Sequence, residues 1–163
     1  MKKSNIVLIG MPGAGKSTVG VVLAKAAGLE FVDTDLIIQR QTGKKLQEII
    51  NNDGIDAFLN TEGEIISGLK CQNCVIATGG SAVFSDKAMK NLSRDGIVVF
   101  LDVPLTEIKR RVDNITTRGI AMKPGETLET VYNDRLPLYK KYADITVSCK
   151  NTEQTVEEIL NKL

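Results

Sequence analysis

The sequence predicts an α/β fold in which helices flank a parallel β-sheet. Short runs of β-branched and other apolar residues alternate along the chain with longer segments of helical period, and this alternation is typical of a parallel sheet. The first apolar run leads directly into a glycine-rich loop that precedes a helical segment. The 163 residues have the usual length of one domain, and no linker rich in Pro, Gly or Ser divides them. We therefore expect a single domain over residues 1–163.

Five strands are expected, because five runs are short, apolar and rich in β-branched residues: 5–9, 31–33, 74–77, 97–102 and 145–148. Apolar residues at helical spacing indicate eight helices between and after them: 16–27, 35–41, 45–52, 56–70, 86–92, 105–114, 128–143 and 152–163. The remaining long connection, residues 114–127, contains Arg-Gly and Pro-Gly pairs and is expected to be a mobile loop.

Composition excludes several classes of function. Lys and Arg number 21 against 20 Asp and Glu, a net charge of +1, so the chain has no uniform basic field that would attract nucleic acid or acidic membranes. Four Phe, three Tyr and no Trp offer few surfaces on which bases could stack. Because the chain contains no His, a general base must be Asp, Glu, Lys, Cys or Tyr, and His-ligated zinc is excluded.

The cysteines and the apolar runs predict a protein of the reducing cytoplasm. Three cysteines, an odd number, do not make a disulfide framework. Cys71 and Cys74 have the spacing of a redox or metal pair, but no second pair and no His accompanies them, so we interpret their spacing as chance. The basic start is too short for a signal peptide, and no apolar run approaches the roughly 18–20 residues that cross a bilayer.

The glycine-rich loop is the strongest motif. Residues 10–17 fit the pattern G-x-x-x-x-G-K-[ST] in full, between an apolar strand and a helix as that pattern requires. Its backbone N–H groups and the helix N-terminus would face phosphates, Lys16 would add a positive charge, and Ser17 would offer a hydroxyl to Mg²⁺. The expected nucleotide-binding residues of the loop are Gly13, Ala14, Gly15, Lys16, Ser17 and Thr18. The alternative is a tight turn that uses glycine only for its backbone freedom.

Two carboxylates follow the second strand. The carboxyl ends of parallel strands gather at one sheet edge, so Asp33 and Asp35 should face the phosphate loop, and a strand period of two would place both on the same side. Asp33 could then hold a water of the Mg²⁺ shell, and Asp35 could orient or deprotonate an attacking hydroxyl. The alternative for Asp35 is a helix N-cap only.

Other nucleotide-binding classes fit less well. A GTPase would need an Asn-Lys-x-Asp segment, which the sequence lacks. The apolar strand that ends at Asp102 would make Asp102 an alternative metal residue, but Asp33 already offers a carboxylate at the expected edge, and a buried parallel strand is the simpler interpretation.

These residues resemble the shikimate kinases, which are small P-loop kinases similar in fold to nucleoside monophosphate kinases. The resemblance covers nearly the whole chain, on residues 10–18, 31–35, Gly43, Phe58, Glu62, 77–80, Arg111, Arg118, 135–139 and 143–144. It implies a three-layer P-loop kinase fold with a five-stranded parallel sheet and a mobile lid at about 114–127. It also implies that about 34–61 is the acceptor-binding segment.

The resemblance implies a role for each matching residue. On the acceptor side, Asp35 would hold and assist the attacking hydroxyl, Gly79 and Gly80 would offer backbone N–H groups, and Arg135 would hold a carboxylate. On the nucleotide side, Arg111 would lie against the adenine. The remaining implied roles are Mg²⁺ binding by Ser17 and Asp33, and catalysis by Lys16, Asp35 and the lid arginine Arg118.

The family pattern fails at several positions on the acceptor side. Leu59 stands where a second carboxylate-binding Arg is usual, Ser81 replaces a third glycine, Ile55 replaces a Glu, and Gly119-Ile120 replaces Pro-Leu after the lid arginine. A charge-assisted hydrogen bond contributes about 1.5–3 kcal/mol, so the missing Arg should weaken a carboxylate substrate roughly 10- to 150-fold. A cation such as Lys44, Lys45 or Arg135 alone would have to bind the substrate carboxylate in place of the missing Arg.

We therefore expect an enzyme that transfers the γ-phosphoryl group of ATP, with Mg²⁺, to a hydroxyl of a small molecule. Shikimate, phosphorylated at its 3-hydroxyl in aromatic amino acid biosynthesis, is the first candidate acceptor. The alternatives are a related kinase for another hydroxylated metabolite, because of Leu59, and a nucleotide-binding regulator without transfer activity. We expect a cytoplasmic monomer that binds neither nucleic acid nor membranes.

Overall fold

The computed structural model describes residues 2–112 and 119–163. Its centre is one parallel sheet with the strand order β2-β3-β1-β4-β5, which confirms the predicted fold class. The strands are β1 (Asn5–Ile9), β2 (Glu30–Asp33), β3 (Cys74–Ala77), β4 (Gly96–Asp102) and β5 (Ile145–Ser148). All five predicted strands are therefore present, within one residue of their predicted bounds.

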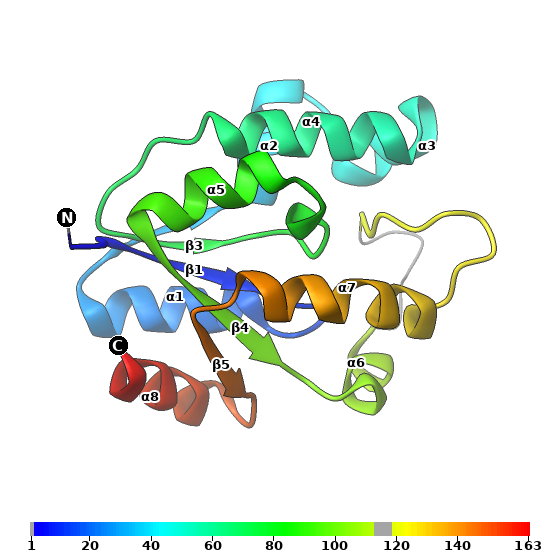
Figure 1. Cartoon of the computed structure of the whole chain (residues 1–163). Coiled ribbons are helices and arrows are strands. Elements are labelled where there is room, and N and C mark those ends of the chain that lie inside the picture. Colours follow the sequence, from blue (N-terminus) through cyan, green and yellow to red (C-terminus); the bar gives the residue numbers. More distant parts are fainter. Residues whose placement is uncertain (1, 113–118) are drawn as a thin grey trace.

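Eight α-helices flank the sheet in the part of the chain that the structure describes. They are α1 (Lys16–Ala27), α2 (Thr34–Thr42), α3 (Leu46–Asp53), α4 (Ile55–Ser67), α5 (Asp86–Asp95), α6 (Leu105–Arg111), α7 (Leu128–Tyr142) and α8 (Thr152–Lys162). Figure 1 shows α1 and α8 on one face of the sheet and α5 and α7 on the other, which makes the three layers expected of a P-loop kinase fold. Helices α2, α3 and α4 form a separate group beside the sheet, where α4 packs on α5.

The structure differs from the sequence prediction at one unexpected helix and at several helix ends. Helix α4 ends at Ser67 instead of residue 70, and α6 ends at Arg111 instead of residue 114. A short 3-10 helix, η1 (Ala82–Phe84), follows β3 and was not expected. Helix α5 also runs to Asp95 and passes into β4 with no loop between them. Gly96 permits this junction, because a Cβ atom there would lie 2.7 Å from both the Leu92 carbonyl oxygen and Val7 Cγ2.

Two apolar clusters stabilise the fold. The larger one lies on both faces of the sheet, where β1 is buried along its whole length and the Phe100 ring stacks on Tyr139 with centroids 5.2 Å apart. The smaller cluster joins α2, α3 and α4 through Ile38, Ile49 and Phe58. The acceptor-binding segment predicted from the resemblance therefore has a small core of its own. Among the described helices, none combines the length and apolarity that a bilayer crossing requires.

The sheet brings the predicted site residues to one edge. The phosphate loop follows β1, the Asp33–Asp35 pair lies where β2 meets α2, and Gly79 and Gly80 come two and three residues after β3. Thr78 ties two of these strand ends together, since its Oγ1 donates a 2.8 Å hydrogen bond to the Leu8 carbonyl oxygen. Of the predicted lid, the structure describes only residues 119–127, so its mobility stays a prediction.

Candidate active site

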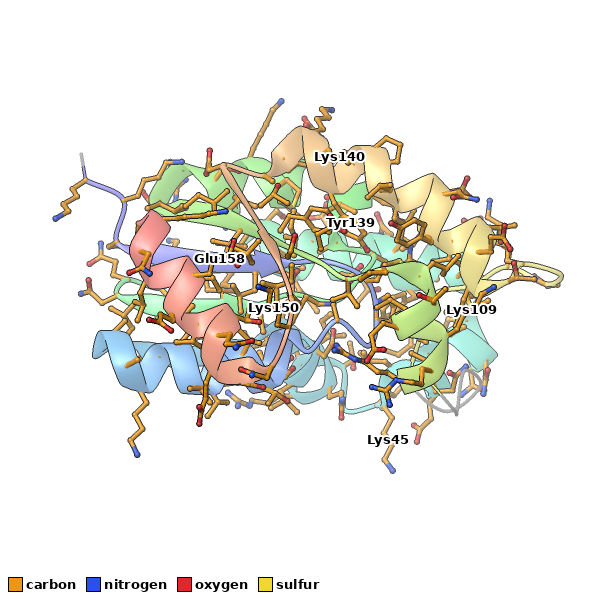
Figure 2. All side chains as sticks on the ribbon, turned by 90° about the horizontal axis from the view of Figure 1, so that it is seen from below. Lys45, Lys109, Tyr139, Lys140, Lys150 and Glu158 are labelled. Carbon is orange, nitrogen blue, oxygen red and sulfur yellow. The ribbon has the colours of Figure 1, made fainter. Side chains whose placement is uncertain are left out.

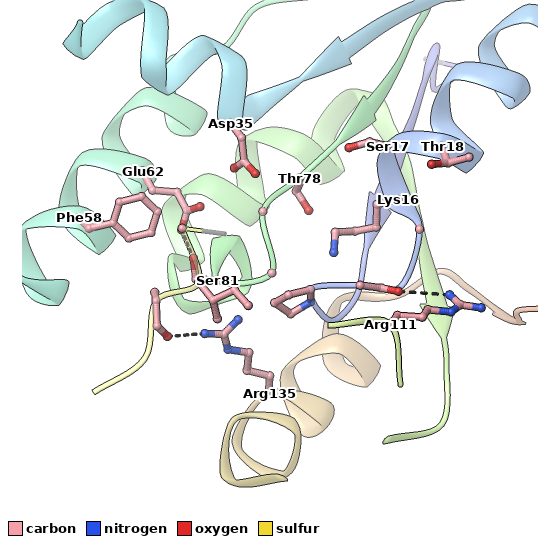
Figure 3. A pocket seen from close by; sticks show the side chains of 18 residues that line it. Lys16, Ser17, Thr18, Asp35, Phe58, Glu62, Thr78, Ser81, Arg111 and Arg135 are labelled. Atoms are coloured by element: carbon pink, nitrogen blue, oxygen red, sulfur yellow. Dashed lines mark hydrogen bonds between the residues drawn. The ribbon is translucent and has the colours of Figure 1, made fainter. Parts of the chain in front are cut away.

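A polar cavity of about 270 Å³ opens at the carboxyl edge of the sheet (Figure 3). The phosphate loop and the start of α1 line one end of it. Residues of α4, of the loop between β3 and η1, and of α7 line the other end. Its lining includes these predicted site residues: Gly13, Gly15, Lys16, Ser17, Thr18, Asp35, Gly79, Gly80, Arg111 and Arg135. The fold therefore joins the predicted nucleotide and acceptor sides in one cavity.

The phosphate loop has the backbone that its glycines predict. Gly13 and Gly15 have φ angles of +83° and +89°, in the left-handed region that favours glycine. The Lys16 side chain is 8% exposed, and its Nζ donates 2.7 Å hydrogen bonds to the carbonyl oxygens of Gly10 and Met11. Ala14, within the loop, is buried and does not line the cavity. Lys16 lines the cavity, so the loop holds its cation where the phosphates of a nucleotide are predicted to lie.

Ser17 and Asp33, the predicted Mg²⁺ residues, lie in contact with each other. The Ser17 hydroxyl donates a 3.1 Å hydrogen bond to Asp33 Oδ2 across the gap between α1 and β2. A hydroxyl and a carboxylate are hard oxygen donors, and Mg²⁺ binds proteins through one or two such groups while keeping waters and substrate phosphates as its other ligands. Neither Asp33 nor Asp102, the alternative metal residue at the end of β4, is among the residues that line the cavity. The hydrogen bond with Ser17, which does line it, is what links Asp33 to the phosphate loop.

The structure corrects the predicted geometry of Asp33 and Asp35. Strand β2 ends at Asp33 and α2 begins at Thr34, so a strand period of two does not relate the two carboxylates. The N-cap of α2 is Asp33, whose Oδ1 accepts a 2.9 Å hydrogen bond from the Asp35 backbone N–H. The alternative that Asp35 serves only as an N-cap is therefore wrong. Asp35 lies in the first helical turn and its side chain points into the cavity (Figure 3).

Asp35 has the environment of a group that takes up a proton. Its Oδ1 is buried and has no hydrogen-bond partner among the described residues. Burial raises the pKa of Asp35 to about 6, the nearby Asp33 charge adds to the rise, and Lys16 opposes it. A general base works best with a pKa near the operating pH. Asp35 is thus equipped to accept a hydrogen bond or a proton from an acceptor hydroxyl.

A second buried carboxylate, Glu62, lies on the acceptor side. It comes from α4, is 1% exposed, and its Oε1 accepts a 2.6 Å hydrogen bond from the Ser81 hydroxyl. Burial raises the pKa of Glu62 to about 7, while the Ser81 hydrogen bond lowers it and the Asp35 charge raises it. Glu62 carried no assigned role in the sequence prediction. The signal was present, since Glu62 stands four residues after Phe58 on the buried face of α4.

Gly79 and Gly80 let side chains approach the backbone. A Cβ atom on Gly79 would lie 2.8 Å from both Asp35 Oδ1 and Glu62 Oε2. A Cβ atom on Gly80 would lie 2.9 Å from Arg135 Nη1 and 2.8 Å from Pro12 Cδ. Any larger residue would therefore displace these charged groups, and the glycines keep the centre of the cavity open.

Arg135 is the cation at the acceptor end. It is 2% exposed, its Nη2 donates a 2.7 Å hydrogen bond to the Ala121 carbonyl oxygen, and its guanidinium lies 5.4 Å from the Phe84 ring centroid. One helical turn on, the Tyr139 hydroxyl donates a 2.7 Å hydrogen bond to the Gly80 carbonyl oxygen. Helix α7 is thereby fixed against the loop that follows β3, and Arg135 is held at the cavity wall.

Arg111 lies at the nucleotide end. Its Nη1 donates a 3.2 Å hydrogen bond to the Gly13 carbonyl oxygen, and its Nε donates to Glu107 at 2.9 Å. The described part of the predicted lid completes the wall, since Ile120 and Ala121 line the cavity and the Gly119 N–H donates to Gln47 on α3 at 3.1 Å. Arg118, the predicted lid arginine, lies outside the described residues.

The structure shows where the missing second arginine would have been. Leu59 is half-buried, packs against the smaller apolar cluster and lines a neighbouring cavity of about 250 Å³ that also contacts Arg135. Lys44 pairs with Asp53 at the surface, at 3.5 Å, and Lys45 projects away from the body of the protein (Figure 2). Neither lysine lines the main cavity, so of the three predicted replacements only Arg135 is placed to act.

Comparisons with known proteins show which family the chain is part of. The family model described as shikimate kinase matches residues 12–163. The chain belongs to the shikimate kinase family. A curated shikimate kinase from Vibrio cholerae serotype O1 is 36% identical over 165 residues, which cover 99% of this chain and 94% of the relative.

Solved structures of shikimate kinases share the fold over nearly the whole chain. The structure described as shikimate kinase from Acinetobacter baumannii in complex with shikimate has a TM-score of 0.89 and 31% identity, and covers 98% of this chain and 92% of that chain. The shikimate kinase from Aquifex aeolicus has a TM-score of 0.80 and 31% identity, with 96% and 94% covered. As a member of the shikimate kinase family, the protein is an ATP-using phosphotransferase that acts on an alcohol group.

Proposed function

We propose that the protein transfers the γ-phosphoryl group of MgATP to the 3-hydroxyl of shikimate, a step of aromatic amino acid biosynthesis. The observation that carries this proposal is the single cavity that is lined by the phosphate loop, the Asp35 carboxylate and the Arg135 guanidinium. A nucleotide, an attacking hydroxyl and a carboxylate would each meet a group of suitable charge there. Membership in the shikimate kinase family supports the choice of acceptor.

The nucleotide side would position and neutralise the phosphates. The loop N–H groups and Lys16 would hold the β- and γ-phosphates, Arg111 would lie against the adenine, and Arg118 would close over the phosphates from the lid. Ser17 and Asp33 would hold Mg²⁺, directly or through its waters. When bound there, Mg²⁺ would supply positive charge that offsets the negative charge developing on the phosphates during transfer. Phosphoryl transfer depends mainly on such positioning and charge neutralisation.

The acceptor side would orient the attacking hydroxyl. The unpartnered Oδ1 of Asp35 would accept the hydrogen of that hydroxyl and align its oxygen with the γ-phosphorus. Gly79 and Gly80 would offer N–H groups to the ring, and Arg135 would hold the carboxylate. The wall formed by Ile120 and Ala121 would keep out water, which would otherwise compete for the phosphoryl group.

The test is ADP release in a coupled assay with MgATP and shikimate up to tens of millimolar, with the product identified by mass spectrometry. The high range is needed because Leu59 removes one carboxylate contact, and a roughly 10- to 150-fold weaker acceptor still reacts at high concentration. Shikimate 3-phosphate is the expected product. If ATP binds and shikimate stays unchanged, the acceptor has been wrongly chosen.

The alternatives are less well supported. A different hydroxylated metabolite as acceptor rested on Leu59, but the family match and the shikimate kinase relatives favour shikimate. A regulator without transfer activity would have no need of Asp35 beside the phosphate loop. A panel of hydroxylated metabolites without a carboxylate, run in the same assay, separates these alternatives.

We further propose that the protein works as one cytoplasmic domain and as a monomer. In this arrangement, residues 34–61 bind the acceptor and residues 114–127 form the lid. The separate small core under α2, α3 and α4 supports the first assignment, and the contact of Gly119 with Gln47 supports the second. Sedimentation velocity at micromolar concentration tests the monomer, for which a mass of 17.7 kDa is expected.

A further inference from the structure

Glu62 is a buried carboxylate in which one oxygen accepts a hydrogen bond and the other has no described hydrogen-bond partner. Its Oε1 accepts the Ser81 hydrogen bond at 2.6 Å, whereas its Oε2 is buried without a hydrogen-bond partner in the described chain. Burying a carboxylate without partners is costly, so a free oxygen that faces a cavity indicates a group waiting for a ligand.

The free oxygens of Glu62 and Asp35 converge on one point. Both lie 2.8 Å from the position that a Cβ atom would take on Gly79, so they are at most twice that distance apart. Figure 3 shows the two carboxylates on the same side of the cavity, Asp35 from α2 and Glu62 from α4. A ligand that presents two hydroxyls near Gly79 would satisfy both oxygens at once.

The charged groups around Glu62 do not by themselves explain the direction in which its carboxylate points. The charges that act on it come from Asp35 on α2, Lys16 on α1 and Arg135 on α7. No described cation forms an ion pair with Glu62, and the hydrogen bonds of Arg135 and Lys16 that are described go to backbone carbonyl oxygens. Within the described residues, the hydrogen bond that reaches the Glu62 carboxylate comes from the Ser81 hydroxyl.

Ser81 is itself held rigidly. It precedes η1, and its carbonyl oxygen accepts a 3.1 Å hydrogen bond from the Phe84 N–H, while the Ala82 N–H donates to the Gly79 carbonyl oxygen at 3.2 Å. The neighbouring Gly80 carbonyl oxygen is held by Tyr139. A hydroxyl on this fixed turn can restrict a long, flexible glutamate side chain at little further entropic cost.

We propose that Ser81 is a positioning residue that aims Glu62 at the hydroxyls of the acceptor, so that Glu62 and Asp35 together grip a polyol beside Gly79. This proposal rests on the proposed function for the hydroxylated nature of the acceptor. Since Leu59, which lines the neighbouring cavity, provides no charge for a carboxylate, the pair makes the selection of the acceptor depend on its hydroxyls as well as on its carboxylate.

The first test needs no acceptor. Carboxyl ¹³C NMR titration of the free protein follows Glu62 in the wild type and in Ser81→Ala. The Ser81 hydrogen bond lowers the pKa of Glu62, so its loss should move the titration upward from about 7. Ser67→Ala is the control, because its hydroxyl bonds to the Glu64 carbonyl oxygen on the outer side of α4. An unchanged titration in Ser81→Ala would overturn the proposal, whether or not shikimate is the substrate.

The second test separates positioning from folding. Ser81→Ala should raise the acceptor KM about tenfold and leave the ATP KM and the melting temperature near wild type. Glu62→Gln should raise the acceptor KM similarly, because it replaces the carboxylate that would accept the hydrogen of an acceptor hydroxyl. Adding Ser81→Ala to it should have almost no further effect on the acceptor KM, because Ser81 would act only by aiming that carboxylate. Equal losses from Ser81→Ala in the two backgrounds would show that Ser81 acts elsewhere, and the proposal would fall.

The two tests also separate this proposal from the proposed function. If shikimate is not phosphorylated, the proposed acceptor is wrong, and the KM comparison is made with whichever hydroxylated acceptor the panel identifies. The titration decides the Ser81–Glu62 contact in either case. Ser81→Gly serves as a second variant, since it removes the hydroxyl without leaving a methyl group in the cavity.

Discussion

The Ser17 hydroxyl lies 3.1 Å from Asp33 Oδ2 and joins the phosphate loop to the end of β2. If this pair serves the metal, Asp33→Asn should raise the Mg²⁺ concentration needed for half-maximal rate about 10- to 100-fold, because it removes the charge that orients the metal or its waters. The asparagine still accepts the Asp35 N–H and caps α2, so stability should stay near wild type. Mg²⁺ titrations of the rate and thermal melts measure the two effects.

Asp33→Ala is the matched comparison, since it removes both the charge and the cap. It should show the same Mg²⁺ defect and also lose about 1 kcal/mol of stability. A normal Mg²⁺ requirement in both variants would remove Asp33 from the metal site and reopen the case for Asp102.

Asp35→Asn should lower kcat about 100-fold or more and leave the ATP KM nearly unchanged, because the amide cannot take a proton from the attacking hydroxyl. In the wild type, kcat should fall as the pH drops through about 6, where Asp35 becomes protonated. Asp53→Asn, at the exposed end of α3, is the control. Steady-state kinetics from pH 5 to 9 provide the measurement, and normal turnover in Asp35→Asn would remove its assigned role.

Arg135→Lys should raise the acceptor KM roughly 10- to 150-fold, because a lysine lacks the planar fork that bonds to Ala121 and faces the cavity at once. The ATP KM should not change, since Arg135 lies at the opposite end of the cavity from Ser17. Arg94→Lys, on the exposed end of α5, is the control. An unaltered acceptor KM would mean that Arg135 supports the wall alone and that another group holds the carboxylate.

Much of the fold was predictable because its signals are local. A run such as 5–9 is apolar along its length, and the loop that follows needs its glycines, lysine and serine in a fixed order. The strand-to-loop-to-helix context then places Lys16 and Ser17 with no knowledge of the rest of the chain. The Asp33 cap was missed because the start of α2 shifted by one residue, which is decided by competition between strand and helix ends.

The acceptor side was less predictable because its contacts join distant parts of the chain. Ser81 and Glu62 are 19 residues apart and meet only when η1 packs beside α4. Arg135 forms a hydrogen bond with Ala121, 14 residues earlier in the chain, and Gly119 forms one with Gln47, 72 residues earlier. The sequence contains each residue, but periodicity and motif spacing carry no information on which side chains will pair across packed helices.

Glu62 also makes stability depend on pH. Burial raises its pKa from 4.5 to about 7, so between these values the folded protein holds a proton that the unfolded chain has released. Stability must therefore fall as the pH rises through this window, and the cost above it is about 3.4 kcal/mol at most, at 1.36 kcal/mol for each pKa unit. The burial of the Glu62 carboxylate thus lowers the stability of the fold, which is consistent with a functional reason for its position.

Glu62→Gln should accordingly be more stable than the wild type at pH 8, by about 1–3 kcal/mol, because a neutral amide of the same shape can accept the Ser81 hydrogen bond without the cost of a buried charge. The gain should shrink as the pH falls and vanish near pH 4, where the glutamate is protonated in both the folded and unfolded states. Urea unfolding of the two proteins at pH 4, 6 and 8 measures this difference. Glu64→Gln, exposed on the same helix, should show no such trend. A difference independent of pH would mean that burial does not raise the pKa of Glu62. The free energy with which Glu62 is proposed to bind the acceptor would then have to come from something other than relief of its buried charge.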